Sequence, residues 1–171
     1  ARITPPAQLA MILESLSSQA VLTLSGFKDR LPLAADQPCV CLDEFLAQAP
    51  WPAEDADQNV VVPRPGDLCF VLFTSGTTGR PNGVQVTHRN VCNVLLTAPG
   101  NLGMKPGMIV GQILNIAFDM AAWEILGCLA HGATLHIRTQ DIGQTARLCQ
   151  VLIATPSILG TLDPQQCPDL E

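Results

Sequence analysis

Short apolar runs alternate along the second half of the chain with stretches in which apolar residues recur every three or four positions. The apolar runs, which predict strands, lie at 68–73, 84–86, 108–114, 133–137 and 151–154. The periodic stretches, which predict helices, lie at 87–96, 118–131 and 141–149. Strands that alternate with helices indicate an α/β fold, here a layered and mostly parallel sheet flanked by helices. The run at 68–73 is apolar throughout, so we expect it to be a central strand covered on both faces.

The first third of the chain gives shorter signals. Periodic apolar residues predict helices at 5–18 and 41–49, and an apolar run predicts a strand at 20–25. The stretch 49–66 combines prolines with acidic residues. We expect a surface loop there, because proline removes a backbone donor and charges resist burial. The length suits one domain, so residues 1–171 are expected to form a single unit.

Composition narrows the class of protein. Of the 171 residues, 47% are hydrophobic and 14% are charged, which favours a folded globular chain over disorder. The net charge of -6 and the lack of a basic stripe argue against nucleic acid or an anionic membrane surface as partner. Every apolar run is too short to span a bilayer, and the first residues do not resemble a signal peptide. The chain begins without Met, so we expect it to have been cut from a longer one.

The seven cysteines are odd in number and lie mostly in apolar stretches. A secreted disulfide framework favours an even count in a shorter chain. Cys39 and Cys41 have no second pair, and His88, His131 and His136 stand at no zinc-like spacing from them. We therefore expect reduced, buried thiols in a cytoplasmic protein, and no metal site.

A loop rich in glycine and hydroxyl groups follows the run at 68–73. Its residues Thr74, Ser75, Gly76, Thr77, Thr78 and Gly79 precede Arg80 and Pro81. Glycines let the backbone approach a bulky anion, and hydroxyl and N–H groups can donate to phosphate oxygens. The loop lacks the Gly-Lys-Ser/Thr of a Walker motif. From composition alone, a plain Ser/Thr/Gly turn remains the alternative.

The whole string FTSGTTGRPNGV, residues 73–84, resembles the phosphate-loop signature of adenylate-forming enzymes. That superfamily includes acyl-CoA synthetases, luciferases and the adenylation domains of nonribosomal peptide synthetases. The resemblance implies that Thr74 to Gly79 hold the phosphates of ATP, with Mg²⁺ as counter-charge. Asn82 stands where the family usually has Lys, which removes a cation near the loop.

The predicted helix at 118–131 begins with a second informative group. Asp119 and Trp123 are four positions apart, and Met120 and Trp123 are three apart, so the three share one face. A carboxylate beside apolar side chains can form a pocket for an ammonium group and a side chain. The alternative is that Asp119 simply stabilises the start of the helix, with Met120 and Trp123 in the core.

The segment FDMAAWEILGCLAHGATL, residues 118–135, resembles the corresponding segment of peptide-synthetase adenylation domains, with Ala121 where Ser is common. The resemblance implies that Asp119 holds the α-amino group of an amino acid and that Met120 and Trp123 line its side-chain pocket. The segment 151–164 is similar to one that supplies a further pocket residue, here Ile153. No residue is implied as a covalent nucleophile, and no catalytic residue is assigned.

The family reaction joins an amino-acid carboxylate to ATP, releases pyrophosphate and passes the acyl group to a carrier-protein thiol. The resemblance covers nearly the whole chain but ends before the family's adenine-binding motifs, hinge and small C-terminal domain. Residues 1–171 are therefore expected to be a partial domain that needs the remaining adenylation-domain segments, is inactive alone and exposes apolar surface for self-association. The alternatives are another acyl or aryl ligase of the superfamily, for which Asp119 would have no amine, and a non-catalytic nucleotide-binding or scaffold module.

Overall fold

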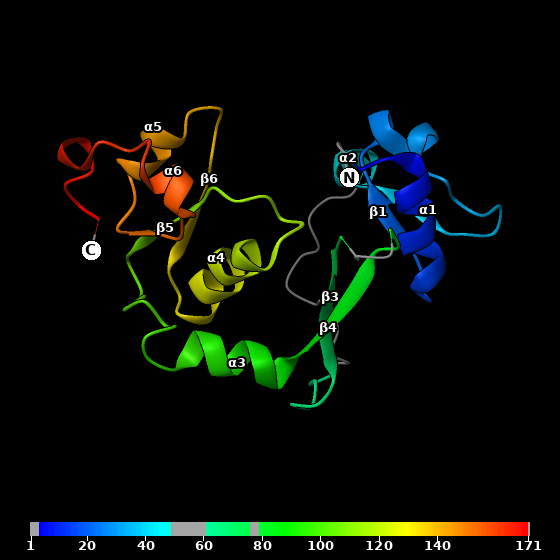
Figure 1. Ribbon diagram of the computed structural model, residues 1–171, viewed down its shortest axis with the longest axis horizontal. Coiled ribbons are helices and arrows are strands. Elements are labelled where there is room, and N and C mark those ends of the chain that lie inside the picture. Colours follow the sequence, from blue (N-terminus) through cyan, green and yellow to red (C-terminus); the bar gives the residue numbers. More distant parts are fainter. Residues whose placement is uncertain (1–3, 49–60, 76–78, 171) are drawn as a thin grey trace. The chain divides into compact units, whose positions relative to one another are not determined.

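The computed structural model describes residues 4–48, 61–75 and 79–170 (Figure 1). The chain divides into two compact units, one of residues 1–63 and 73–84 and the other of residues 64–72 and 85–171. The single partial domain expected over 1–171 stays a prediction. Of the surface loop expected at 49–66, residues 61–66 are described; they are exposed and belong to no helix or strand.

The first unit pairs two short parallel strands beside two helices. Its elements are α1 (Pro6–Ser15), β1 (Val21–Thr23), the 3₁₀ helix η1 (Ser25–Arg30), β2 (Cys39–Cys41) and α2 (Leu42–Gln48). Val21 lies opposite Cys39 in the parallel β1–β2 ladder. The helices expected at 5–18 and 41–49 and the strand at 20–25 are thus confirmed at shorter lengths. β2 and η1 were missed, because three to six residues are too few to show a period.

Strands β3 (Leu68–Thr74) and β4 (Asn82–Thr87) form a two-stranded sheet. The expectation of a central strand at 68–73 is wrong. Among the described residues β3 pairs with β4 alone, Leu68 is exposed, and the residues from Cys69 to Phe73 are half-buried. A continuous apolar run does not by itself tell a strand covered on both faces from a partly covered one.

The second unit is built around a three-stranded parallel sheet in the order β6–β5–β7 (Figure 1). Its elements are α3 (His88–Leu96), β5 (Ile109–Gln112), α4 (Asp119–Ala130), β6 (Thr134–Ile137), α5 (Ile142–Ala146), β7 (Val151–Leu152), α6 (Pro156–Leu159) and the 3₁₀ helix η2 (Pro164–Gln166). Helix α4 connects β5 to β6, and α5 connects β6 to β7. This arrangement confirms the α/β fold with a mostly parallel sheet and flanking helices.

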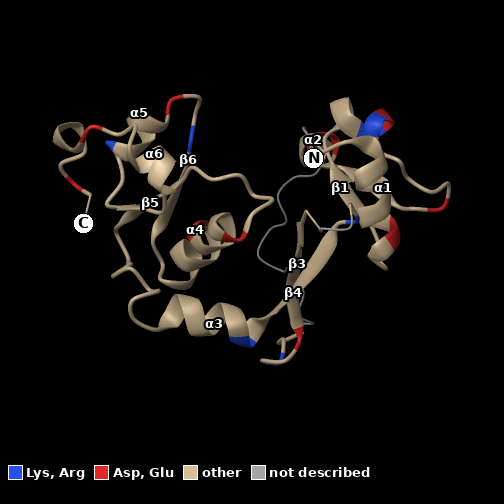
Figure 2. Cartoon of the chain, in the orientation of Figure 1, with Lys and Arg blue, Asp and Glu red and all other residues tan. Residues whose placement is uncertain are grey.

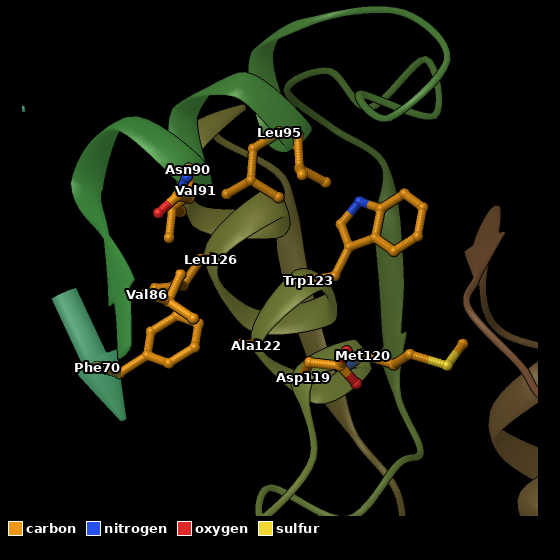
Figure 3. A pocket seen from close by; sticks show the side chains of 11 residues that line it. Phe70, Val86, Asn90, Val91, Leu95, Asp119, Met120, Ala122, Trp123 and Leu126 are labelled. Atoms are coloured by element: carbon orange, nitrogen blue, oxygen red, sulfur yellow. The ribbon is translucent and has the colours of Figure 1, made fainter. Parts of the chain in front are cut away.

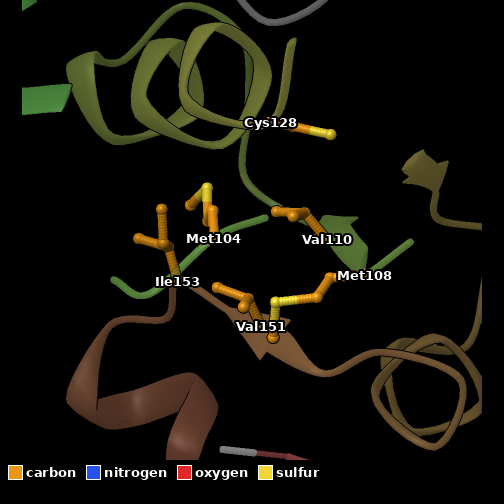
Figure 4. Close-up of a cluster of buried hydrophobic side chains, with 6 residues drawn as sticks. All are labelled: Met104, Met108, Val110, Cys128, Val151 and Ile153. Carbon is orange, nitrogen blue, oxygen red and sulfur yellow. The ribbon is translucent and has the colours of Figure 1, made fainter. Parts of the chain in front are cut away.

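The apolar core of the second unit lies between α4 and the sheet (Figure 4). Its buried residues are Met104, Met108, Val110, Cys128, Val151 and Ile153. The other face of β5 is also covered, because a Cβ built on Gly111 would lie 2.7 Å from Leu152 Cδ1 and 3.1 Å from Cys149 Sγ. β5 is therefore the strand packed on both sides. Burying each large aliphatic or Met side chain here contributes about 1.5–3 kcal/mol to the free energy of folding.

From the sequence we expect Thr87 to cap the helix that runs through Leu96 and Gly132 to end the helix at 118–131, and both helix ends are confirmed. Thr87 Oγ1 accepts from the backbone N–H of Asn90, and the Asn90 side chain accepts from the backbone N–H of Thr87, which makes a capping box for α3. At the end of α4, Gly132 has a φ of 67°, its N–H donates to Leu129 O and the N–H of Ala133 donates to Cys128 O. These two bonds form a Schellman motif, which favours glycine at the left-handed position.

All seven cysteines are free thiols, as expected. Four of them are buried: Cys41, Cys128, Cys149 and Cys167. The expectation of burial is wrong for Cys92, which is exposed because it lies on an outer face of α3.

Among the described residues, no helix combines the length and the apolar character needed to cross a bilayer.

Candidate functional site

A cavity of about 280 Å³ opens beside the first turns of α4 (Figure 3). Its walls come from the β3–β4 sheet, α3 and α4. The residues that line it are Phe70, Val86, Asn90, Val91, Val94, Leu95, Asp119, Met120, Ala122, Trp123 and Leu126. Most of this lining is hydrocarbon, which suits an apolar group.

The structure brings Asp119, Met120 and Trp123 together at this cavity, as their spacing predicts (Figure 3). Asp119 is the first residue of α4 and is exposed, and its Oδ1 accepts from the N–H of Met120 at 2.9 Å. A carboxylate at this position is also favoured by the helix dipole. Met120 and Trp123 are half-buried and pack against the core. The arrangement places a charge at the rim of an apolar space.

Two other polar atoms of the lining, Trp123 Nε1 and Asn90 Oδ1, are engaged by the protein itself. Trp123 Nε1 donates to the backbone oxygen of Gly100 at 2.8 Å. Asn90 Oδ1 accepts from the N–H of Thr87 at 3.0 Å and from Thr87 Oγ1 at 2.7 Å. Asp119 is thus the charged group that this lining offers to a ligand. Helix α4 carries acidic residues and no basic ones (Figure 2).

Sequence reasoning missed the role of Glu124, the second acid of α4. Its side chain is fully buried and accepts from the N–H groups of Ile113 and Leu114 and from Gln112 Nε2. Burial raises the pKa of this carboxyl, and the N–H donors of Ile113 and Leu114 partly offset that rise. An acid on the apolar, inward face of a predicted helix is the signal that could have revealed it.

Ile153 does not line this cavity. It is 5% exposed and belongs to the core cluster, against which Met120 and Trp123 pack. Its expected role as a pocket residue stays a prediction. The structure places its side chain in the core that supports the two pocket residues (Figure 4).

The candidate phosphate loop joins β3 to β4. Gly76, Thr77 and Thr78 lie outside the described residues. Thr74, Ser75 and Gly79 are exposed, and Gly79 has a φ of 78°, a conformation that glycine adopts without strain. The described loop residues thus include an exposed Ser75 and a left-handed Gly79, while Thr74 Oγ1 donates to the backbone oxygen of Asn82 at 3.4 Å. Phosphate binding by this loop stays a prediction.

Within the described parts of the chain, no three His, Cys, Asp or Glu side chains are grouped to hold a metal ion.

Comparison with known proteins relates this chain to one family of enzymes and to two kinds of larger protein. The sequence pattern described as AMP-binding enzyme matches residues 3–165. Adenylate-forming reductase 06235 of Coprinopsis cinerea is 44% identical over 153 residues, which are 88% of this chain and 15% of that protein. Bassianolide nonribosomal cyclodepsipeptide synthetase of Beauveria bassiana is 30% identical over 174 residues, 98% of this chain and 6% of that protein. This chain therefore spans a small part of the relatives that it matches.

The fold is also similar to a solved structure. The crystal structure of the nonribosomal peptide synthetase FmoA3 superposes with a TM-score of 0.74 at 25% identity, covering 98% of this chain and 19% of that one. The α/β arrangement of parallel strands and flanking helices described above is thus shared with a peptide synthetase.

Proposed function

Because the chain belongs to the AMP-binding enzyme family, whose members form adenylates, we propose that it takes part in the activation of an amino acid by ATP. In this reaction a carboxylate oxygen of the amino acid attacks the α-phosphorus of MgATP. The bond from that phosphorus to the bridging oxygen breaks, pyrophosphate leaves with the electron pair, and an aminoacyl-adenylate forms. No protein nucleophile is required, so the protein's part is to position the substrates and stabilise charge.

The exposed carboxylate of Asp119 at the rim of the apolar cavity carries this proposal. A substrate ammonium paired with Asp119 would place the rest of the amino acid against Met120 and Trp123. Both residues pack against the core cluster that contains Ile153. A charge-assisted hydrogen bond of this kind contributes about 1.5–3 kcal/mol to the free energy of substrate binding.

The cavity also favours an apolar substrate side chain. The indole N–H of Trp123 donates to the backbone oxygen of Gly100, so the side chain presents only ring carbons to a ligand. The amide oxygen of Asn90 is likewise engaged by Thr87. Because most of the lining is hydrocarbon, a polar substrate side chain would lose its water and gain few partners here, which costs free energy.

The phosphates of MgATP are assigned to the loop Thr74 to Gly79, with Gly76, Thr77 and Thr78 included by resemblance. The exposed Ser75 and the left-handed conformation of Gly79 support this assignment. Transfer of the acyl group to the thiol of a carrier protein would follow. We expect residues 1–171 alone to lack amino-acid-dependent ATP–pyrophosphate exchange.

The test uses the complete gene product that carries these residues. ATP–pyrophosphate exchange is measured with a panel of amino acids and with matched acids in which hydrogen replaces the amine. We expect exchange with apolar amino acids. The variant Asp119→Asn should lower kcat/KM for the amino acid by about 10- to 100-fold and change the matched acid little, since it removes the charge-assisted bond. The control Asp36→Asn, at an exposed position of the first unit, should change neither. Exchange with amine-free acids alone would overturn the proposal.

A second candidate is the adenylation step of an adenylate-forming reductase, which the higher identity to such a protein favours, 44% against 30%. The two candidates share adenylate formation and differ in the next step. Product analysis of the complete gene product separates the two candidates. A reductase releases the activated acid in reduced form, whereas a synthetase builds it into a peptide or depsipeptide.

For a non-catalytic nucleotide-binding or scaffold module, the discriminating measurement is an ATP titration that follows the amide signals of residues 74–83. A scaffold would show no change at millimolar ATP.

A further inference from the structure

Glu124 is a fully buried acid that lies five residues after Asp119 on α4 and lines no part of the cavity. Removing a carboxylate from water is unfavourable unless hydrogen bonds compensate for the lost hydration. The contacts of Glu124 supply that compensation. Its Oε1 accepts from the N–H of Ile113 at 3.0 Å, and Oε1 and Oε2 accept from the N–H of Leu114 at 3.3 and 3.2 Å. A buried carboxylate with this many N–H partners holds those groups in place.

The groups that Glu124 holds begin the connection from β5 to α4. β5 ends at Gln112, whose backbone oxygen still accepts from the N–H of Arg138 beside β6. Beyond that point the N–H groups of Ile113 and Leu114 bond to Glu124. Gln112 Nε2 adds a bond of 3.1 Å to Glu124 Oε2 and one of 2.6 Å to the backbone oxygen of Leu114. The carboxylate thus fixes the first residues after the strand.

The connection ends at Asp119 after one compact turn. The N–H of Ala117 donates to Asn115 Oδ1 and the N–H of Phe118 to the backbone oxygen of Asn115, both at 3.0 Å. Ala121 then continues the helix by donating to Phe118. A short, internally bonded turn is thus all that separates Leu114 from Asp119.

We propose that Glu124 is a positioning residue for the substrate-binding carboxylate: by holding the start of the β5–α4 connection, it sets where Asp119 stands at the rim of the cavity. This inference rests on the proposed function, because it concerns Asp119 as the partner of a substrate amine. Glu124 does not touch the substrate. It acts on recognition of the amine through the backbone, while Met120 and Trp123 keep their packing against the core.

The test is the ratio of kcat/KM for the preferred amino acid to kcat/KM for its amine-free counterpart, measured in the complete gene product. Glu124→Gln replaces one acceptor oxygen with an NH₂ group that faces N–H donors. We expect the ratio to fall on the order of tenfold, the size of coupling found between interacting residues. KM for ATP should stay unchanged. The matched control is Glu44→Gln, an exposed acid of α2. Equal losses for both substrates, which leave the ratio unchanged, would mean a merely structural role and overturn the inference.

A double-mutant cycle shows whether Glu124 acts through Asp119. In an Asp119→Asn background, Glu124→Gln should lower the ratio no further. A further drop of similar size would overturn the inference. Gln112→Ala removes the side-chain donor to Glu124 and its bond to the backbone oxygen of Leu114, but keeps the N–H bonds of Ile113 and Leu114 to Glu124. It therefore tests the inference even if Glu124→Gln does not fold; a smaller fall of the ratio is expected, and no fall counts against it. If Asp119→Asn alone leaves the ratio unchanged, the proposed function fails. If it lowers the ratio while Glu124→Gln and Gln112→Ala do not, this inference alone fails.

Discussion

The indole nitrogen of Trp123 donates a hydrogen bond to the backbone oxygen of Gly100, 2.8 Å away. The bond joins α4, which lines the cavity, to the connection between α3 and β5. It also explains how a half-buried tryptophan satisfies its single donor. The side chain proposed to line the substrate pocket therefore has a structural bond of its own.

Trp123→Phe keeps an aromatic ring and removes this donor. We expect the free energy of unfolding to fall by about 1–3 kcal/mol, because Gly100 loses its partner and the smaller ring leaves space. Urea unfolding of the purified chain measures the change. Phe118→Leu serves as control, since Phe118 is 62% exposed and should shift stability by no more than about 0.5 kcal/mol. Equal stability of the parent chain and Trp123→Phe would contradict the structural role.

Gly100 has no room for a side chain. A Cβ built there would lie 2.0 Å from the backbone oxygen of Val94, so the backbone itself has to move. Gly100→Ala should destabilise the chain by about 2 kcal/mol or more. Gly26→Ala is the matched control, because a Cβ at Gly26 meets nothing within 4 Å. Urea midpoints of the two variants should differ clearly, and similar midpoints would count against this packing.

The pattern of the sequence predicted some of these features because they are local. The spacing of Asp119, Met120 and Trp123 fixes them on one helix face, and the glycine at 132 marks the end of α4. Features that depend on distant parts of the chain were not predictable. Gly100 meets Trp123, and Glu124 reaches back to the end of β5, only after the chain has folded.

The misplaced central strand has the same origin. The run at 68–73 is more apolar than the shorter strand β5, yet β5 lies between β6 and β7 and is packed on both faces. Strand order is decided by the crossover connections through α4 and α5, which hydrophobicity does not encode. The position of Ile153 in the core is a tertiary feature of the same kind.

In the first unit, Asp43 is predicted to titrate below its ordinary range. The hydroxyl and the N–H of Ser25 both donate to its carboxylate, the N–H at 2.9 Å, and these bonds lower the pKa of Asp43. The associated stabilisation is present above the pKa of Asp43 in the unfolded chain and is lost as pH falls through the lower, folded value. Carbon-detected NMR titration should show that Ser25→Ala raises the pKa of Asp43 towards normal. Ser17→Ala, at an exposed position, should not.

The thiols should differ strongly in reactivity. Burial raises the pKa of Cys149 to about 11, while Cys92 is exposed on α3. At pH 8 a thiol with that pKa is about one part in a thousand thiolate, the reactive form, and the side chain is also shielded. Maleimide labelling with peptide mass spectrometry should modify Cys92 first and Cys149 only under denaturing conditions. Labelling of Cys149 in the folded chain at the rate of Cys92 would contradict its burial.

Self-association is expected from the edge of the larger sheet. β6 is an edge strand among the described residues, and Ile137 at its end is 69% exposed. Edge strands with exposed apolar side chains pair with other copies, and lysine at such a position prevents pairing. Light scattering of residues 1–171 at rising concentration should show oligomers, and Ile137→Lys should shift the chain towards monomer. Thr139→Lys adds the same charge at an exposed position beyond the strand and separates the edge effect from net charge. If the parent chain stays monomeric at high concentration, or if both variants dissociate it equally, the edge of β6 is not the contact.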